Sequence, residues 1–288
     1  MDTSAVGKDV ERTQVDIKVI QLPAKYLTGE LDRRLPQWAR RTNPIIRRQL
    51  GLYWKTIMPE LDTLAKVVLV QIVLVALSLP WPWLFDLALP TITAALLLFP
   101  IAVYLYAQML VAIGVRATLS MADELRKGTF DLVRTTPLPL TTILASKIAA
   151  AIWRQLENLS LLMTAVAVMS MPLLISQYAS LFPLDTYPVL ARVSMALGLV
   201  VSLLRLALEP FMVGALALAA GTVFPARSTA IITTLFLGGF YFFLLNLVRL
   251  VPSSWPVHFV VEFILPLLLP LVIIGVALKI TTHLITRN

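Results

Sequence analysis

Within the apolar part of this chain, the residues best placed to do chemistry are an arginine and a glutamate in one helical segment. Arg205 and Glu209 lie four residues apart inside the apolar run 189–221, and Pro210 follows directly. Residues at this spacing share a helix face, so the two opposite charges can neutralise each other. Ionisable groups in membrane-buried segments are costly and usually functional. We therefore expect either a structural ion pair facing a helix bundle, or part of a translocation path or subunit contact that engages a charged headgroup.

The sequence contains none of the motifs expected for enzymatic chemistry. No stretch matches Gly-x-x-x-x-Gly-Lys-Ser/Thr, so the chain cannot bind nucleotide phosphates by that route, and if it is a pump we expect its ATPase to be a separate chain. His258 and His283 fall at opposite predicted faces of the membrane and cannot share a metal ion. There is no cysteine, which excludes disulfides and thiolate ligands. We expect no catalytic residue, no metal site and no cofactor within this chain.

The composition is that of an integral membrane protein with an all-α fold. Of the 288 residues, 58% are hydrophobic and 14% are charged, and the mean hydropathy is +0.84. A soluble domain has roughly 45–50% apolar and 25% charged residues. Apolar runs near the roughly 20 residues needed to cross a hydrocarbon core recur along the chain. We expect six membrane-spanning helices, at about 61–80, 91–116, 143–175, 189–221, 228–250 and 259–280.

Basic residues are distributed unevenly between the segments that connect these spans. The N-terminal segment, the loop 117–142, Arg227 and the C-terminal tail hold most of the 24 Lys and Arg residues. The connections near 81–90, 176–188 and 250–258 hold none. The positive-inside rule then places both termini and the 117–142 loop in the cytosol of a multi-pass plasma-membrane protein, bacterial or archaeal. The net charge of +8 therefore reports topology, and we expect no nucleic acid partner.

A charged segment rich in proline and threonine, residues 121–147, separates two long apolar runs. Gly128 suits the end of one helix, and Thr129 suits the N-cap of another. The short helix that follows has an apolar side and is stopped within about two turns by prolines. A short amphipathic helix projecting on two helical stalks is suited to docking in a groove of another protein. The further residues on which this prediction depends are Phe130, Leu132, Val133, Pro137 and Pro139, with Thr141 or Thr142 as the next N-cap.

Two runs within this segment follow a distinctive order of residue types. Residues 124–133 read Glu-Leu-Arg-Lys-Gly-Thr-Phe-Asp-Leu-Val, and residues 136–147 read Thr-Pro-Leu-Pro-Leu-Thr-Thr-Ile-Leu-Ala-Ser-Lys. The order of a Gly-Thr turn, an acidic residue, Thr-Pro-Leu and a basic residue resembles the first cytoplasmic loop of type 2 ABC exporter permeases. Phe130 and Asp131 stand where Leu and Glu are commoner in that family. The resemblance in layout covers about residues 43–280.

The resemblance implies a permease subunit whose loop carries the coupling helix that receives the stroke of an ATPase. ATP and Mg²⁺ would bind the ATPase subunits, which are separate cytosolic chains. A second permease subunit, identical or related, would complete the transporter. Without the resemblance, the segment is an ordinary cytosolic loop with solvated charges. The residues to which the resemblance gives a role in coupling are Glu124, Arg126, Gly128, Thr129, Phe130, Asp131, Leu132 and Pro137.

The N-terminal part is expected to contain a cytosolic arm, residues 1–42, and an amphipathic helix, residues 43–58, before the six-span domain 59–288. Asn43 can cap this helix, and Pro44 suits its first turn. The helix either lies at the membrane interface, with basic residues toward lipid phosphates, or packs on a soluble neighbour. The nearby first span favours the interface, as does the family resemblance. The residues of its apolar side are Ile46, Leu50, Tyr53, Trp54 and Ile57, and those of its basic side include Arg47, Arg48 and Lys55.

Small residues are concentrated in the segment 214–221. Gly214, Ala217 and Gly221 recur there at helical spacing and so lie on one helix face. Such a face lets a second helix approach closely, and we expect it to be a packing surface.

A different class of function is a secondary carrier, or a membrane scaffold, that uses no ATP. A carrier is expected to show internal repeats and broken helices with ion-binding groups near the membrane midplane. The sequence shows no convincing repeat, and Arg205 with Glu209 is its only candidate site. The apolar spans suit lipid-like or amphipathic cargo, while drugs, glycans and peptides stay open as substrates.

Overall fold

The computed structural model describes residues 35–51, 61–86, 89–181, 186–250 and 255–287. Within these residues the chain is helical and contains no strand. Five helical segments of the described chain are long and apolar enough to cross a membrane, so the protein is an all-α membrane protein. These segments correspond to α5 (Leu89–Arg126), α8 (Leu156–Leu181, of which the segment takes Leu156–Tyr178), α9 (Pro188–Val223), α10 (Arg227–Arg249) and α12 (Leu265–Arg287).

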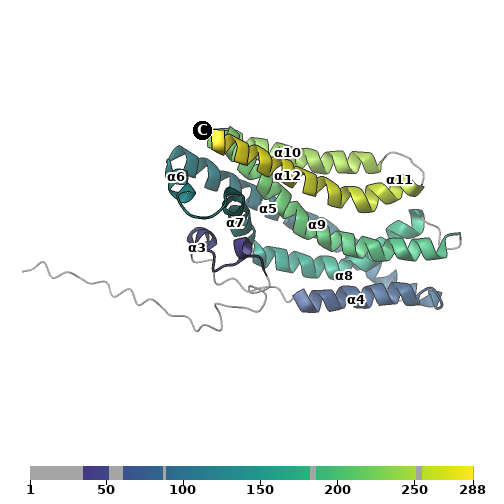
Figure 1. Cartoon of the computed structure of the whole chain (residues 1–288). Coiled ribbons are helices and arrows are strands. Elements are labelled where there is room, and N and C mark those ends of the chain that lie inside the picture. Colours follow the sequence, from purple (N-terminus) through teal and green to yellow (C-terminus); the bar gives the residue numbers. More distant parts are fainter. Residues whose placement is uncertain (1–34, 52–60, 87–88, 182–185, 251–254, 288) are drawn as a thin grey trace, which may run out of the picture.

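The long helices lie side by side along one axis (Figure 1). The central helix is α9, which packs against α5, α8, α10 and α12, and also against α4 (Leu61–Leu77). The end of the bundle that holds the C-terminus also holds η1 (Gln37–Ala39), α3 (Pro44–Leu50), α6 (Thr129–Arg134) and α7 (Leu140–Trp153). The opposite end holds η3 (Pro82–Phe85), α11 (Trp255–Phe259) and the π-helical turn η4 (Val260–Ile264).

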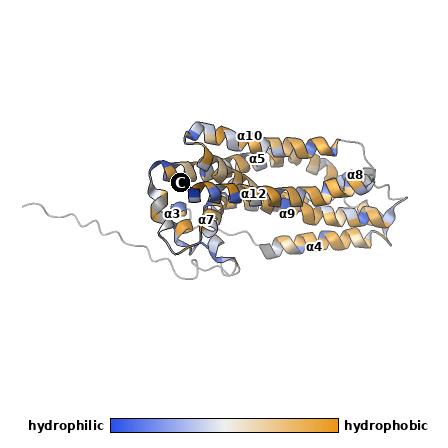
Figure 2. Ribbon diagram, turned by 45° about the horizontal axis from the view of Figure 1, so that its top comes forward, coloured by the Kyte–Doolittle hydropathy of each residue, from blue (hydrophilic) through white to orange (hydrophobic). Residues whose placement is uncertain are grey.

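Hydropathy follows this division (Figure 2). Apolar residues cover the long helices over most of their length, and hydrophilic residues are concentrated at the end that holds α3 and the C-terminus. Many large apolar side chains on the long helices are exposed, among them Leu97, Phe236 and Phe243. Lipid tails are as apolar as these side chains, so a bilayer solvates them without penalty.

The third predicted span, 143–175, is wrong as a single helix. The chain forms α7 up to Trp153, turns over the next two residues and continues as α8. The turn is attached to N-terminal elements, because Nε1 of Trp153 donates a 2.8 Å hydrogen bond to the carbonyl of Ala39. Arg154 likewise donates to the carbonyl of Gln49. The first part of the predicted span is therefore a separate helix of 14 residues, too short to cross a bilayer.

The first predicted span, 61–80, corresponds to α4. This helix has 17 residues, slightly fewer than the roughly 20 that cross a hydrocarbon core. Residues 52–60, which precede it, lie outside the described part of the chain. The second, fourth and sixth predicted spans each fall within one of the five candidate segments, and the fifth, 228–250, does so except for its last residue.

The small-residue face predicted on α9 is a packing surface. A β-carbon added at Gly214 would lie 2.6 Å from Cγ2 of Ile148 in α7. One added at Gly221 would lie 2.9 Å from the carbonyl oxygen of Thr118 in α5. Ala217, between them, is fully buried. Both neighbouring helices thus approach α9 more closely than larger residues would allow, which confirms the prediction.

Candidate functional site

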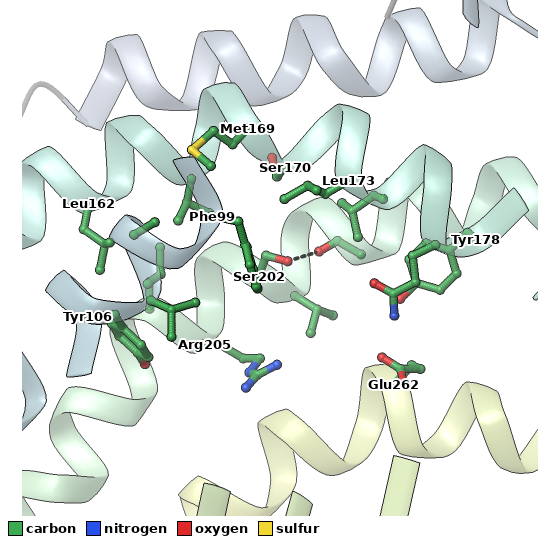
Figure 3. Close-up of a pocket in the computed structure, with 18 of the residues that line it drawn as sticks. Phe99, Tyr106, Leu162, Met169, Ser170, Leu173, Tyr178, Ser202, Arg205 and Glu262 are labelled. Carbon is green, nitrogen blue, oxygen red and sulfur yellow. Dashed lines mark hydrogen bonds between the residues drawn. The ribbon is translucent and has the colours of Figure 1, made fainter. Parts of the chain in front are cut away.

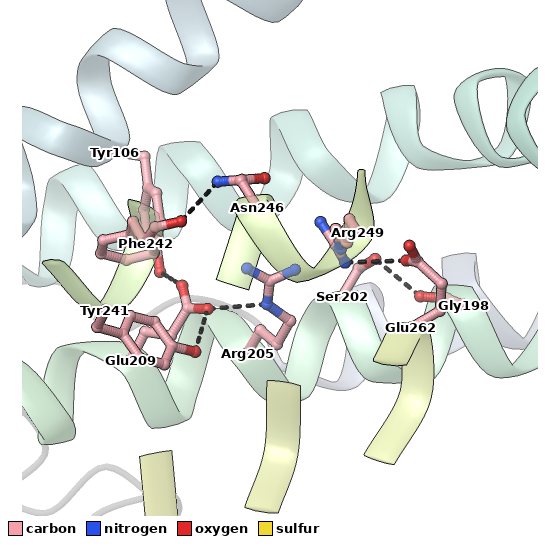
Figure 4. Close-up of polar contacts among 10 residues, drawn as sticks. All are labelled: Tyr106, Gly198, Ser202, Arg205, Glu209, Tyr241, Phe242, Asn246, Arg249 and Glu262. Carbon is pink, nitrogen blue, oxygen red and sulfur yellow. Dashed lines mark hydrogen bonds and ion pairs between the residues drawn. The ribbon is translucent and has the colours of Figure 1, made fainter. Parts of the chain in front are cut away.

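Glu209 lies at the centre of a polar cluster inside the bundle. Its side chain is 1% exposed, and Nε of Arg205 donates a 2.8 Å hydrogen bond to its Oε1. The hydroxyl of Tyr241, on α10, donates to the same oxygen at 3.2 Å, and the hydroxyl of Tyr106, on α5, donates to Oε2 (Figure 4). The carboxylate is therefore satisfied by one charged and two neutral donors from three helices. The four-residue spacing in the sequence predicts the contact of Glu209 with Arg205. No local sequence pattern predicts its contacts with Tyr106 and Tyr241.

A second ion pair, which sequence patterns did not predict, lies in the same region (Figure 4). Nη2 of Arg249, at the end of α10, is 2.9 Å from Oε2 of Glu262 in η4. Glu262 is buried, and Nε of Arg249 is buried without a hydrogen-bond partner among the described residues. The sequence feature that could have indicated this pair is a single acidic residue in the sixth apolar segment together with a basic residue at the end of the fifth. Single π-helical turns such as η4 are rare and frequently occur at functional sites.

Three of these charged side chains line a cavity of about 540 Å³ between α5, α8, α9, α10 and η4. Arg205 and Arg249 contribute guanidinium groups and Glu262 a carboxylate, while Glu209 is not part of the lining. Figure 3 shows Arg205 and Glu262 projecting into the space between α8, α9 and η4. A cavity of this kind can accommodate a molecule with an apolar body and a charged group. Other lining residues are Phe99, Leu162, Met169 and Leu173, with Ser170 and Ser202 as polar positions.

The segment between α5 and α7 forms the short helix expected from the sequence. After α5 ends, Gly128 has a φ of +65°, which glycine adopts without strain, and α6 begins at the next residue. Thr129 is therefore the first residue of α6 rather than its N-cap. The N-cap of α7 is Pro139, not Thr141 or Thr142, because the extended backbone of the proline lets the helix begin immediately after it.

One side of α6 is attached to the bundle and another is exposed. Phe130 is buried, whereas Leu132 is 69% exposed. Pro137, in the connection to α7, is also exposed. The side chain of Asp131 lies outside the described part of the chain. The short helix thus presents an apolar side chain away from the bundle.

A buried ion pair joins the end of α5 to α7 behind this helix. Nζ of Lys147, a residue only 1% exposed, lies 2.5 Å from Oε2 of Glu124 and 5.6 Å from the ring centre of Phe130. Burial lowers the pKa of the Lys147 amine from its ordinary value, and the Glu124 carboxylate acts in the opposite direction. The structure brings Glu124 and Phe130 together, whereas Arg126 is exposed. Lys147 is not among the residues predicted for coupling, although it is the basic residue that ends the motif.

The amphipathic helix begins where the sequence predicts, but α3 ends at Leu50 instead of running through the predicted range 43–58, because Gly51 has a φ of +55°. It also packs on protein. Oδ1 of Asn43 accepts a 3.0 Å hydrogen bond from the amide of Ile45, and its Nδ2 donates to Oγ of Ser146 at 3.0 Å. Ile46 and Leu50, expected to face the membrane interface, are instead buried against α7. Of the other predicted members, Arg47 and Arg48 are exposed, and Tyr53, Trp54, Lys55 and Ile57 lie outside the described residues.

Comparisons with known proteins give no identification. The chain matches no protein-family model, no curated protein and no solved structure. Within the described ranges, no three or more His, Asp or Glu side chains form a group that could hold a metal ion. What supports a function is therefore the geometry of the polar cavity and of the end formed by α5, α6 and α7.

Proposed function

We propose that this protein is the membrane-spanning permease subunit of a type 2 ABC exporter, driven by a separate ATPase. The observation that carries the proposal is α6, a short helix held between the ends of two helices, with Leu132 exposed away from the bundle. Residues 124–147, which contain it, resemble the coupling loop of that family in sequence. A transport role needs no catalytic residue in this chain, because ATP and Mg²⁺ bind the partner ATPase.

In this proposal α4, α5, α8, α9, α10 and α12 are six spans of the plasma membrane. The coupling helix α6 then lies between the second and third spans. The distribution of basic residues supports a cytosolic position for α6 and for both termini. Two permease subunits, identical or related, assemble with two cytosolic ATPase subunits.

The contacts of α6 suggest how a push from the ATPase reaches the bundle. Phe130 is buried and lies against Lys147, which is itself paired with Glu124. A displacement of α6 therefore acts on α5 and α7 together. Movement of these helices would reorient a cavity in the bundle or at the interface with the second permease subunit.

The test is co-purification of the chain in nanodiscs with the ATPase encoded beside it, followed by measurement of ATP hydrolysis. Leu132→Asp places a charge on the exposed side of α6. We expect this variant to insert normally but to lose ATPase association and stimulation. Thr286→Asp is the matched control, because Thr286 is exposed at the same end of the bundle on α12. Association that survives Leu132→Asp, or that both variants reduce equally, would overturn the coupling role of α6.

A secondary carrier or scaffold without ATP is favoured by a different observation. Ion pairs inside one chain flank a cavity, and a carrier binds its substrate or coupling ion through such charged groups. Transport of a solute by the purified chain alone in proteoliposomes would support the carrier. A chain that neither transports alone nor binds an ATPase would favour the scaffold.

A further inference from the structure

A cavity of about 590 Å³ lies where α3, α5 and α7 meet, at the end of the bundle that holds the C-terminus. It shares no lining residue with the polar cavity between α8 and η4. Two acidic side chains line it, against five basic ones. The basic residues are Arg48, Arg116, Lys127, Lys147 and Arg154, and the acidic residues are Asp123 and Glu124.

The two acidic side chains neutralise only one of these five basic side chains. Glu124 binds Lys147, and Oδ1 of Asp123 lies 2.5 Å from Nε of Arg227, which is outside the lining. The cavity therefore keeps a surplus of positive charge. Among the residues that the structure describes, the lining side chains that take part in no ion pair are Arg48, Arg116 and Lys127.

Arg116 indicates most directly that the cavity takes a ligand. Its Nη1 atom is buried and has no hydrogen-bond partner in the described ranges. A buried charged donor without an acceptor is strongly unfavourable, so this group requires an acceptor from outside the described chain. Arg116 is the last residue of the second predicted span, 91–116, so it lies where that span leaves the hydrocarbon core. That position corresponds to the depth of lipid headgroups.

We propose that this cavity binds a phosphate group. Guanidinium groups bind phosphate oxygens in bidentate fashion, and a phosphate supplies the negative charge that the lining lacks. At headgroup depth the phosphate belongs to an anionic phospholipid, and a soluble phosphate compound offers the same chemistry. A concave site of this volume is better suited to binding a lipid headgroup than to binding the flat surface of another protein. The site needs no ATPase, so it is independent of the proposed transport function.

The test compares Arg48→Gln with Arg47→Gln. Both arginines are exposed on α3, but only Arg48 lines the cavity. The purified full chain in a neutral detergent is titrated with short-chain phosphatidylglycerol, with phosphatidylcholine and with inorganic phosphate, and bound ligand is counted by native mass spectrometry. Phosphatidylglycerol should bind about tenfold more weakly to Arg48→Gln, because one charge-assisted contact is lost. Its affinity for Arg47→Gln should be the same as for the natural chain. Arg116→Gln should lose at least as much affinity for phosphatidylglycerol. If Arg116→Gln fails to fold, the comparison of Arg48→Gln with Arg47→Gln decides alone.

The three ligands distinguish the sources of the phosphate. Phosphatidylglycerol binding that inorganic phosphate does not displace identifies the lipid headgroup, whereas displacement at low concentration identifies a soluble phosphate. The proposal is overturned if Arg47→Gln and Arg48→Gln lose equal affinity for phosphatidylglycerol. It is also overturned if phosphatidylcholine binds as tightly as phosphatidylglycerol. It is also overturned if neither phosphatidylglycerol nor phosphate binds, or if Arg48→Gln impairs only ATPase association.

Discussion

Glu209 and Arg205 form one ion pair, but the two residues have different surroundings. The carboxylate accepts hydrogen bonds from Arg205, Tyr106 and Tyr241 and is not part of the cavity lining. The guanidinium of Arg205 does line the cavity. One member of the pair thus holds three helices together, while the other is accessible to a ligand. The two hypotheses drawn from the sequence, a structural pair and a translocation path, are therefore compatible at this site.

Removal of the carboxylate alone should be more harmful than removal of both charges. Glu209→Leu leaves Arg205 charged and unpaired inside the bundle, and we expect the free energy of unfolding to fall by about 3 kcal/mol. When Arg205→Met is added, both charges are replaced by apolar side chains and most of this loss should be recovered. Thermal unfolding in detergent measures both variants. A double variant no more stable than Glu209→Leu would mean that the tyrosine contacts, rather than charge pairing, dominate.

At the scale of helices, α3 and α7 form a unit at one end of the bundle. Their contact buries Ile46 and Leu50, and it is reinforced by the hydrogen bond from Asn43 to Ser146. This unit explains why the apolar stretch 143–175 is not one span: its first part packs on protein instead of lipid. An apolar pattern cannot distinguish the two environments, because both are nonpolar.

Gly221 provides a direct test of the close packing between α5 and α9. An added β-carbon would lie 2.9 Å from the carbonyl oxygen of Thr118, which cannot move without shifting α5. We expect Gly221→Ala to lower the free energy of unfolding by about 1–3 kcal/mol. Gly275→Ala, on α12, is the control, since an added β-carbon there has no neighbour within 4 Å and alanine favours a helix. Equal unfolding midpoints for the two variants would contradict the packing described for α9.

At the scale of the whole molecule, the proposed orientation can be tested with single cysteines, because the natural chain has none. Thr135 is exposed just after α6, and Tyr187 is exposed at the start of α9, at the opposite end of the bundle. A membrane-impermeant maleimide should label Tyr187→Cys in intact cells and Thr135→Cys only after permeabilisation. The reverse pattern would place α6 outside the cytosol, where no ATPase could reach it.

Features that depend on residues close in sequence could be predicted, and contacts between distant segments could not. The short helix after Gly128 follows from local turn and proline chemistry, and the pairing of Arg205 with Glu209 follows from helical spacing. The ion pair of Arg249 with Glu262 depends on which helices are neighbours and on the π-helical turn, neither of which a periodic apolar pattern encodes. The two cavities likewise exist only through tertiary packing, so their lining residues come from segments far apart in the chain.

The length of α5 has a mechanical consequence. It is one helix of 38 residues, about 57 Å long at 1.5 Å per residue. Tyr106 lies in the cavity wall near its middle, while Glu124, in its last turn, is held by Lys147 behind α6. A helix so anchored is a lever: a tilt of about 5° imposed at one end displaces the other by roughly 5 Å. If α5 pivots at Pro100, Tyr106 lies only about 9 Å from the pivot at 1.5 Å per residue, and Glu124 lies about 36 Å from it. A tilt of about 5° then moves Glu124 by roughly 3 Å and Tyr106 by roughly 0.8 Å. In the proposed transporter, a displacement at α6 would therefore reach the cavity wall about fourfold reduced.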